Sequence, residues 1–264
     1  MPKDDEGLTD VEVVRFVAEG FVRLPGAFPR EVADAGRALL CAATGCDPDD
    51  PTTWTRPVVR LPGFGDEPFR AAVNTPRLHA AFDRLVGAGR WVPRSGLGTF
   101  PIRFPHPDDP GDDGWHVEGS YPDPATGGYR LNLRSRGRAL LMLFLFSDVG
   151  VDEAPTRIRV GSHLDVPPLL APTGEDGAEF FAFARRMVPA SAGRPVVTAT
   201  GAAGDVYLCH PFLVHAAQRH RGSRPKFMAQ PPLEPVAELD LDRVDPSPVE
   251  RACCADWAGL GSPA

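Results

Sequence analysis

The run Ala139-Leu-Leu-Met-Leu-Phe-Leu-Phe146 is the longest apolar stretch of the chain, and it has only eight residues. A membrane-spanning helix requires roughly 20. The run predicts a strand at Arg138–Ser147, because breaking residues, Gly137 and Asp148, lie on either side. Comparable short runs, separated by breaks of Gly, Pro and Asp, occur on both sides of it. They are Gly98–Phe104, Trp115–Ser120, Thr156–Val160, Val196–Thr200, Asp205–Cys209 and Lys226–Ala229.

The first third of the chain predicts helices instead. The segment Leu8–Gly20 opens with a capping box, because Glu12 follows Thr9 by three residues, and it closes with a glycine. Its pattern is that of one amphipathic helix. Further elements expected in this third are a short strand at Phe21–Leu24 and helices at about Arg30–Ala43 and Pro76–Val86.

Helices followed by short strands, without strand–helix alternation, predict a mainly β fold with flanking helices, arranged as an antiparallel sandwich or jelly roll. One helix at about Asp176–Met187 interrupts the strands. At 264 residues, a single domain over residues 1–264 is the simplest organisation. We expect a mostly helical layer at about 8–90, a jelly-roll core at about 91–231, and a Pro-rich acidic extension at 232–264 with a short helix near Pro248–Trp257.

Composition argues against several classes of partner. The chain has 35 acidic and 28 basic residues, a formal charge of −7, and its Arg residues are scattered, so no nucleic-acid partner is expected. The charged N-terminus has no apolar stretch behind it that would serve as a signal peptide, so we expect a cytoplasmic protein with no membrane partner. The five cysteines contain no CxxC pair and are expected to be reduced thiols. The oligomeric state is open.

Three His-x-acid pairs occur, at His106-Pro-Asp108, His116-Val-Glu118 and His163-Leu-Asp165. Such a pair is of interest because an oxygen-activating iron site takes two imidazoles and one carboxylate on one face of the metal. Seven His and 35 acidic residues predict about one accidental match, so the spacing alone is weak. The first pair lies in a Pro- and Gly-containing loop and the third follows a turn. Only the second lies in strand-like sequence, where alternation puts His116 and Glu118 on the same face.

The third ligand must come from another part of the chain. The segment Gly201–His215 predicts a turn, a strand ending near His210, and a second apolar strand carrying His215. A structural histidine bonded to backbone explains His210 well, so His215 is the better ligand. Downstream, Arg224 and Lys226 are separated by one residue and are expected on one face of the next strand. These cations either bind a dicarboxylate or form a solvated basic turn.

The order and separation of several blocks resemble the phytanoyl-CoA dioxygenase-like family of iron(II)/2-oxoglutarate oxygenases over nearly the whole chain. The blocks are Leu8–Ala27, Trp115–Glu118, Arg138–Asp148, Thr156–His163 and Gly204–Lys226. The resemblance implies that His116, Glu118 and His215 bind iron(II) and that a double-stranded β-helix holds them. It also implies that 2-oxoglutarate is the co-substrate, alongside O₂ and a small-molecule substrate.

Two positions depart from the usual pattern of that family. The metal carboxylate is usually Asp, so Glu118 adds a methylene while keeping the ligand chemistry. The family's usual Arg for the distal carboxylate of 2-oxoglutarate lies eleven positions after the distal His, which is Lys226 here. Spacing favours Lys226, whereas the planar fork of a guanidinium favours Arg224. Because a halogenating relative needs the carboxylate's coordination position for chloride, Glu118 argues against halogenation.

The resemblance therefore implies a dioxygenase that hydroxylates or otherwise oxidises a C–H bond of a small molecule. A composition rich in Ala, Arg, Gly and Pro is typical of bacteria, and small members of the family often act in secondary metabolism, which favours natural-product tailoring. Two alternatives are a metal-dependent cupin-like isomerase or hydrolase with the same ligands, and a non-catalytic ligand-binding barrel. Succinate formation separates them, because only the oxygenase produces it.

Overall fold

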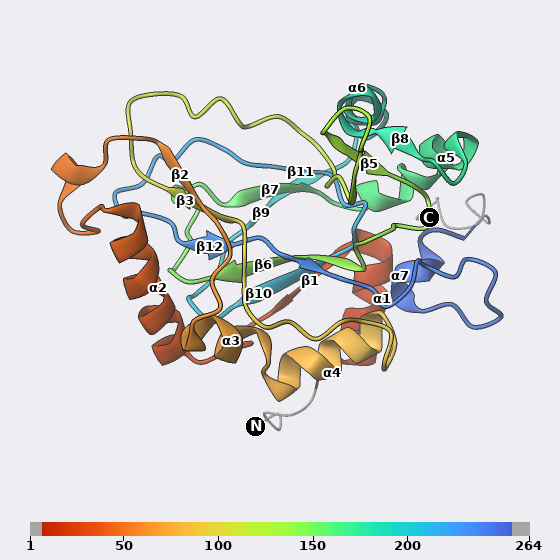
Figure 1. The fold of residues 1–264 in the computed structure, drawn as a ribbon, viewed down its shortest axis with the longest axis horizontal. Helices are drawn as coiled ribbons and strands as arrows, with labels where there is room; N and C mark the ends of the chain where they lie inside the picture. The colour runs from red at the N-terminus through yellow and green to blue at the C-terminus, as the bar shows by residue number, and fades with distance from the viewer. Residues whose placement is uncertain (1–6, 255–264) are drawn as a thin grey trace.

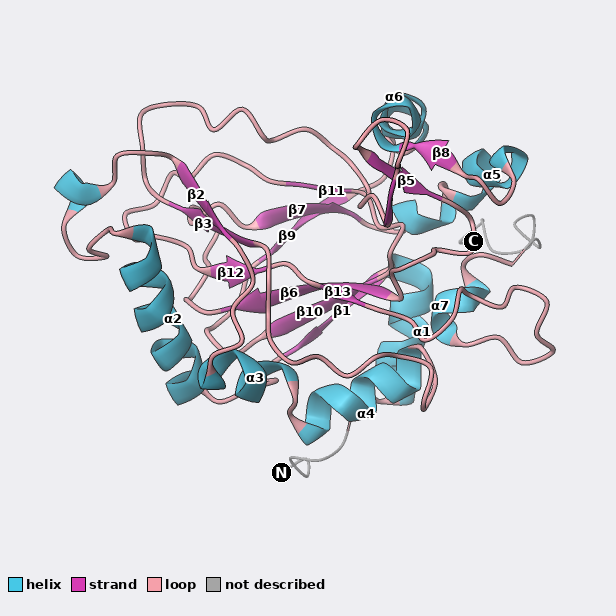
Figure 2. Cartoon of the chain, viewed as in Figure 1, coloured by secondary structure: helices cyan, strands magenta, loops and turns pink. Residues whose placement is uncertain are grey.

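A computed structural model describes residues 7–254 of the chain. Two antiparallel sheets lie one above the other, and helices cover the outer side of the larger sheet (Figures 1 and 2). The larger sheet has the order β1 (Phe21–Leu24), β10 (Val206–Cys209), β6 (Leu140–Leu145) and β12 (Met228–Ala229), and β13 (Pro232–Leu233) also pairs with β6. The smaller sheet has the order β11 (His215–Ala216), β7 (Thr156–Arg159) and β9 (Val196–Ala199). The expected β core with flanking helices is confirmed.

Strand β6 is buried on both faces, which explains why its sequence is apolar without alternation. Leu141, Leu143 and Leu145 pack in a core that also contains side chains of β7, β9 and β10. Met142 and Phe144 point the other way, into the core shared with the helices. The eight-residue apolar run is therefore the central strand of the structure, packed between two layers.

The helical layer consists of α1 (Asp10–Glu19), α2 (Arg30–Thr44), α3 (Glu67–Val73) and α4 (Pro76–Leu85). The predicted capping box is present, because the Thr9 hydroxyl accepts from the Glu12 N–H and the Glu12 carboxylate accepts from Thr9. Gly20 ends α1 in the left-handed region, at φ 86°. The predictions for α1, α2 and α4 are confirmed, whereas α3 was not predicted.

The remaining described elements belong to neither of these two sheets. Strand β2 (Val58–Leu61) pairs with β3 (Phe100–Arg103), and a small sheet is formed by β4 (Tyr121–Pro122), β5 (Tyr129–Leu131) and β8 (Ala178–Glu179). Short helices α5 (Pro167–Leu170) and α7 (Pro248–Arg251) and the longer α6 (Phe180–Ala190) complete the described chain, with three-residue 3₁₀ turns at Pro51–Thr53, Ser162–Leu164 and Ala171–Thr173.

Helix α6 begins later than expected. The prediction placed its start near Asp176, but β8 occupies Ala178–Glu179. The Glu179 carboxylate accepts the N–H groups of Phe181 and Ala182, which caps the helix at that point. The helix expected near the C-terminus is present as α7, and Trp257, where we expected it to end, lies outside the described residues.

The strand predicted at Trp115–Ser120 is wrong. In this segment only His116 forms a β-bridge, to His215. The partner strand β11 is two residues long and pairs with β7 on its other side, so it offers the segment no longer ladder. The backbone is nevertheless extended enough to bury Val117, which is 1% exposed, away from its two neighbours.

Between residues 7 and 254, no helix has both the length and the apolar character needed to cross a bilayer.

Candidate metal centre

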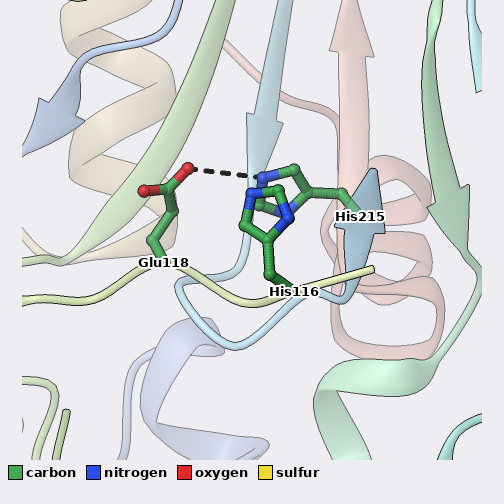
Figure 3. Close-up of side chains that lie close together, drawn as sticks. All are labelled: His116, Glu118 and His215. Atoms are coloured by element: carbon green, nitrogen blue, oxygen red, sulfur yellow. Dashed lines mark ion pairs between the residues drawn. The ribbon is translucent and has the colours of Figure 1, made fainter. Parts of the chain in front are cut away.

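His116, Glu118 and His215 converge on one point (Figure 3). One ligand atom from each residue lies within 4.8 Å of the other two. The two imidazole rings have centroids 4.5 Å apart, and Glu118 Oε1 is 3.3 Å from His215 Nε2. Two imidazoles and one carboxylate form a donor set that binds a divalent transition metal and leaves other positions of the metal open.

Each histidine is oriented by a backbone carbonyl. His116 Nδ1 is 2.8 Å from the Gly114 oxygen, and His215 Nδ1 is 3.0 Å from the Leu213 oxygen. A carbonyl only accepts, so each Nδ1 carries the proton and donates it. In this tautomer the lone pair of each ring is on Nε2, as a metal ligand requires, and in His215 this atom lies beside the Glu118 carboxylate.

The charges of these groups also suit a metal. Burial lowers the pKa of His116, and the neighbouring His215 lowers it further. Burial alone would raise the pKa of Glu118, but its close contact with His215 and the charge of Arg138 outweigh burial and hold this pKa well below its usual range. At neutral pH His116 is therefore neutral and Glu118 is ionised, which are the protonation states that metal binding demands.

A cavity of about 300 Å³ opens beside the three residues. One wall of the cavity is an extended segment whose side chains alternate between two sides. Lys226, Met228 and Gln230 point into the cavity. Phe227 and Ala229 point the other way, into the helix-side core. Other lining residues come from β2, β3, β7 and β13 and from segments next to β3, β6 and the two histidines. They are Arg60, Leu61, Thr99, Phe100, Pro101, Arg103, Asp112, Arg138, Thr156, Ala217 and Pro232.

Gln230 is a site residue that the sequence analysis missed. Its side-chain amide nitrogen donates to Glu118 Oε1 at 2.8 Å and lies 3.3 Å from His215 Nε2. It therefore contacts two of the three candidate ligands and helps to orient the carboxylate. The signal for it was present, since Gln230 lies four residues after Lys226 and so on the same face of an extended chain.

Lys226 lies at one end of this cavity and is only 1% exposed. Its Nζ donates to the Ala154 carbonyl at 2.6 Å, and its backbone exchanges hydrogen bonds with that of Arg103. Burial lowers the pKa of Lys226 to about 7, and the charge of Arg103 contributes, with Asp112 acting in the opposite direction. Such a buried ammonium group gains greatly from an anionic partner.

The other two basic residues at this end already have a carboxylate. Arg103 donates from both terminal nitrogens to Asp112, at 3.0 and 2.7 Å, and Arg60 also pairs with Asp112. Lys226 is different, because its Nζ contacts a neutral carbonyl. Among the cations at this end, Lys226 is therefore the one available to an incoming carboxylate.

Arg224 does not reach the metal centre. It is exposed and lines a separate cavity with Arg30 and Asp148. The prediction that Arg224 and Lys226 share one face fails because residues 222–224 form a bend before the extended segment starts, so alternation does not extend back to Arg224.

The other histidines singled out in the sequence lie away from the cluster. His163 is fully buried, with Nε2 3.0 Å from the Val17 carbonyl, and its ring lies 5.0 Å from that of His210. His210 Nε2 is 3.0 Å from the Val249 carbonyl. His106 lies in an irregular loop, where its Nδ1 accepts from the Asp108 N–H. The backbone-bonded, structural interpretation of His210 fits this geometry.

Comparisons with known proteins agree with this fold. The family model described as phytanoyl-CoA dioxygenase (PhyH) matches residues 18–228. A sequence comparison with curated proteins finds no match. Among solved structures, the non-heme alpha-ketoglutarate-dependent carbocyclase SnoK from nogalamycin biosynthesis is similar, with a TM-score of 0.60, 18% identity, and coverage of 94% of this chain and 95% of that one.

Two further structures have comparable similarity. The epimerase SnoN from nogalamycin biosynthesis has a TM-score of 0.57 and 19% identity, covering 84% of this chain and 80% of its own. HygX from Streptomyces hygroscopicus, solved with nickel and 2-oxoglutarate bound, has a TM-score of 0.53 and 20% identity, covering 85% of this chain and 86% of its own. At these identities the likeness concerns the fold.

Proposed function

The chain belongs to the phytanoyl-CoA dioxygenase family, and on that basis we propose that it is an iron(II)- and 2-oxoglutarate-dependent oxygenase. In this proposal His116, Glu118 and His215 bind the iron, on a jelly roll of the double-stranded β-helix type. The observation that carries it is their convergence within 4.8 Å, with each imidazole presenting Nε2. Two imidazoles and one carboxylate favour iron(II) with open coordination positions.

We assign the distal carboxylate of 2-oxoglutarate to Lys226. Nζ has three N–H donors, and the Ala154 carbonyl accepts one of them. Two donors and a buried positive charge remain, at the end of the cavity where Arg103 is neutralised by Asp112. The carboxylate would supply the counter-charge that the buried Lys226 lacks. The cation would be neutralised, and the carboxylate would be bound by a charged donor.

When bound, iron(II) and 2-oxoglutarate supply, with O₂, an oxidant that is strong enough to break a C–H bond, with succinate and CO₂ as by-products. The protein's own residues bind and orient the reactants: the triad and Gln230 at the metal, Lys226 at the co-substrate. Walls from β2 and from β3, which includes Phe100 and Pro101, restrict water around them.

For the reaction we propose oxidation, in the first instance hydroxylation, of a small natural product. Support comes from what similar structures are described to act on or bind: SnoK and SnoN belong to nogalamycin biosynthesis, and HygX has been solved with hygromycin B. These neighbours include a carbocyclase and an epimerase, and ring formation, which removes two hydrogens from the substrate, is an alternative outcome of the same C–H oxidation. Glu118 occupies the position that a halogenating enzyme needs for chloride, which disfavours halogenation.

The test is an anaerobic titration of iron(II) and 2-oxoglutarate into the purified protein, followed by visible absorption. We expect a weak charge-transfer band that requires both additions. His116→Ala should abolish the band. His106→Ala is the matched control, because His106 also belongs to a His-x-acid pair but lies in a loop outside the triad, and this variant should keep the band.

The outcomes separate the rival functions. Iron binding without a band, in protein that is shown to be folded, would favour the isomerase or hydrolase. Absence of iron binding would favour the non-catalytic barrel. A band followed by succinate formation in air, dependent on His116, supports the oxygenase and justifies a screen of natural-product substrates.

A further inference from the structure

Arg138 is a second buried cation of the metal cavity. It precedes β6, and its side chain is 11% exposed. Nη2 lies 3.7 Å from Glu118 Oε2, too far for a hydrogen bond, and donates to the Gly119 carbonyl with a long contact of 3.4 Å. The guanidinium therefore sits beside the candidate metal carboxylate without being tied to it.

Two of its nitrogens have no partner. Nε and Nη1 of Arg138 are shielded from solvent, and neither has a hydrogen-bond acceptor among the residues the structure describes. A buried N–H group of a charged side chain that lacks an acceptor destabilises the protein. A ligand that brings acceptor oxygens into the cavity would remove this cost.

Residues 7–254 offer no spare anion there. The cavity is lined by two carboxylates, Asp112 and Glu118. Asp112 already pairs with Arg103 and Arg60, and Glu118 is the candidate metal ligand. Arg138 is within ion-pair distance of Glu118, but acceptors for its Nε and Nη1 are left to the molecules that fill the cavity.

The two buried cations approach the triad from opposite directions. Strand β12 runs antiparallel to β6, with Met228 opposite Leu145, so Lys226 lies beyond one end of β6. Arg138 lies just before the other end, at Leu140. The six residues of β6, at about 3.3 Å each, put roughly 20 Å of backbone between its two ends. The side chains of Arg138 and Lys226 nevertheless line the same cavity.

We propose that Arg138 binds the carboxylate of 2-oxoglutarate that is adjacent to the oxo group, while Lys226 binds the distal one. This assignment rests on the proposed function. Ligands at neighbouring coordination positions of a metal lie close together, so a carboxylate that chelates iron next to Glu118 comes within reach of a guanidinium 3.7 Å from Glu118 Oε2. A 2-oxo dicarboxylate thus meets one cation at each end.

This arrangement makes Arg138 a co-substrate-binding residue and explains its unpaired nitrogens. Both forks of the guanidinium have a free donor, Nε on one side and Nη1 on the other, so a carboxylate can be bound on either edge. The alternative partner of Arg138 is an acidic group of the substrate. In that case the loss of Arg138 would leave the affinity for 2-oxoglutarate unchanged.

The test compares three oxo acids in anaerobic, iron-loaded protein. They are 2-oxoglutarate, 2-oxovalerate, which lacks the distal carboxylate, and 4-oxopentanoate, which lacks the carboxylate next to the oxo group. Affinities are measured directly from the charge-transfer band and, for ligands without a band, by competition with 2-oxoglutarate. The variants are Arg138→Gln, Arg138→Lys and Lys226→Met, with Arg134→Gln as the arginine control because Arg134 pairs with the exposed Asp242 outside this cavity.

We expect Arg138→Gln to weaken 2-oxoglutarate and 2-oxovalerate by the same factor, about 10- to 100-fold, as loss of a charged hydrogen-bond pair implies. Lys226→Met should weaken 2-oxoglutarate while 2-oxovalerate stays within about twofold. Arg138→Lys should recover part of the loss, and 4-oxopentanoate should bind equally to wild type and to Arg138→Gln. The control should match wild type throughout.

Other outcomes overturn the assignment in distinguishable ways. If wild type binds 2-oxoglutarate and Arg138→Gln binds it equally well, the inference fails alone, and the acidic group belongs to the substrate. If Arg138→Gln is folded by its melting curve but has lost iron binding in equilibrium dialysis, Arg138 is a positioning residue for Glu118. If wild type binds no 2-oxoglutarate with iron present, the proposed function fails with it.

Discussion

The backbones of His116 and His215 hydrogen-bond to each other in both directions. The His116 N–H donates to the His215 carbonyl at 3.0 Å, and the His215 N–H donates to the His116 carbonyl at 2.9 Å. Within the described chain, this is the sole β-bridge of residues 115–120. The relative position of two candidate metal ligands therefore depends on one bridge and on the side chains that hold the irregular segment in place.

Arg157 is the main such side chain. Its Nη2 donates to the carbonyls of Asp113 (2.6 Å) and Ala217 (2.9 Å), and its guanidinium lies 4.8 Å from the Trp115 ring centre. It thus joins the segments of both histidines. We expect Arg157→Ala to weaken iron(II) affinity by about 10-fold, because groups that orient metal ligands have effects of that size. Equilibrium dialysis measures this; Arg186→Ala, an exposed arginine of α6, is the control, and equal affinities in both variants would contradict the prediction.

Gln230 should affect the metal through Glu118. Because its amide donates to Glu118 Oε1, Gln230→Leu frees the carboxylate to rotate, and we expect iron(II) affinity to fall by about 10-fold. Gln218→Leu is a matched control, since Gln218 donates to the Pro155 carbonyl and does not contact the triad. The idea is refuted if the two variants bind iron alike.

The affinity for 2-oxoglutarate should depend on pH through Lys226. The free protein has a Lys226 pKa of about 7, set mainly by burial and then by Arg103, with Asp112 opposing and His220 nearby. A carboxylate binds the charged form, so binding at pH 8 requires proton uptake, and affinity should fall by about tenfold per pH unit above 7. Below pH 7 the dependence should level off.

Lys226→Arg provides the control for this pH dependence, since a guanidinium stays charged over the same range. In this variant residue 226 no longer titrates between pH 7 and 9. The 2-oxoglutarate affinity should therefore fall less steeply over this range than in wild type. Parallel curves for the two proteins would show that another group titrates.

Glu250 should make the fold sensitive to acid. Its buried carboxylate pairs with both terminal nitrogens of Arg90 and accepts from Ser247. Burial opposes ionisation, but these contacts prevail and lower the pKa of Glu250 to about 2 from a usual 4.5. Since the folded pKa is the lower one, this stabilisation is present above pH 4.5 and is lost as the pH falls towards 2.

Accordingly, Glu250→Gln should lower the free energy of unfolding at pH 7 by about 3 kcal/mol, as breaking a buried pair does. The deficit should shrink as the pH approaches 2. Denaturant unfolding at several pH values measures both effects. Asp242→Asn, which removes the exposed partner of Arg134, should change little, and a deficit for Glu250→Gln that is constant with pH would disprove the titration.

Local patterns predicted the elements that depend on neighbouring residues. The capping box of Thr9 and Glu12 and the left-handed Gly20 delimit α1 as expected, because these contacts span three or four residues. The strand signal of residues 139–146 was equally direct. Strand β2 was missed because it depends on pairing with β3, about 40 residues later. Helix α3 was also missed, and the start of α6 was misplaced although its Glu179 cap is a local contact.

The candidate site divides in the same way. The sequence by itself determined that His116 and Glu118 share one side of an extended segment, since alternation is a local property of the backbone, and its order of motifs identified His215 and Lys226. Only the tertiary structure decided that His215 pairs with His116, that Gln230 and Arg138 flank Glu118, and that Arg224 lies elsewhere. These contacts join residues more than 15 positions apart, and the position of Arg224 depends on the bend at residues 222–224. They are fixed by how β6, β11 and β12 pack, which no local pattern records.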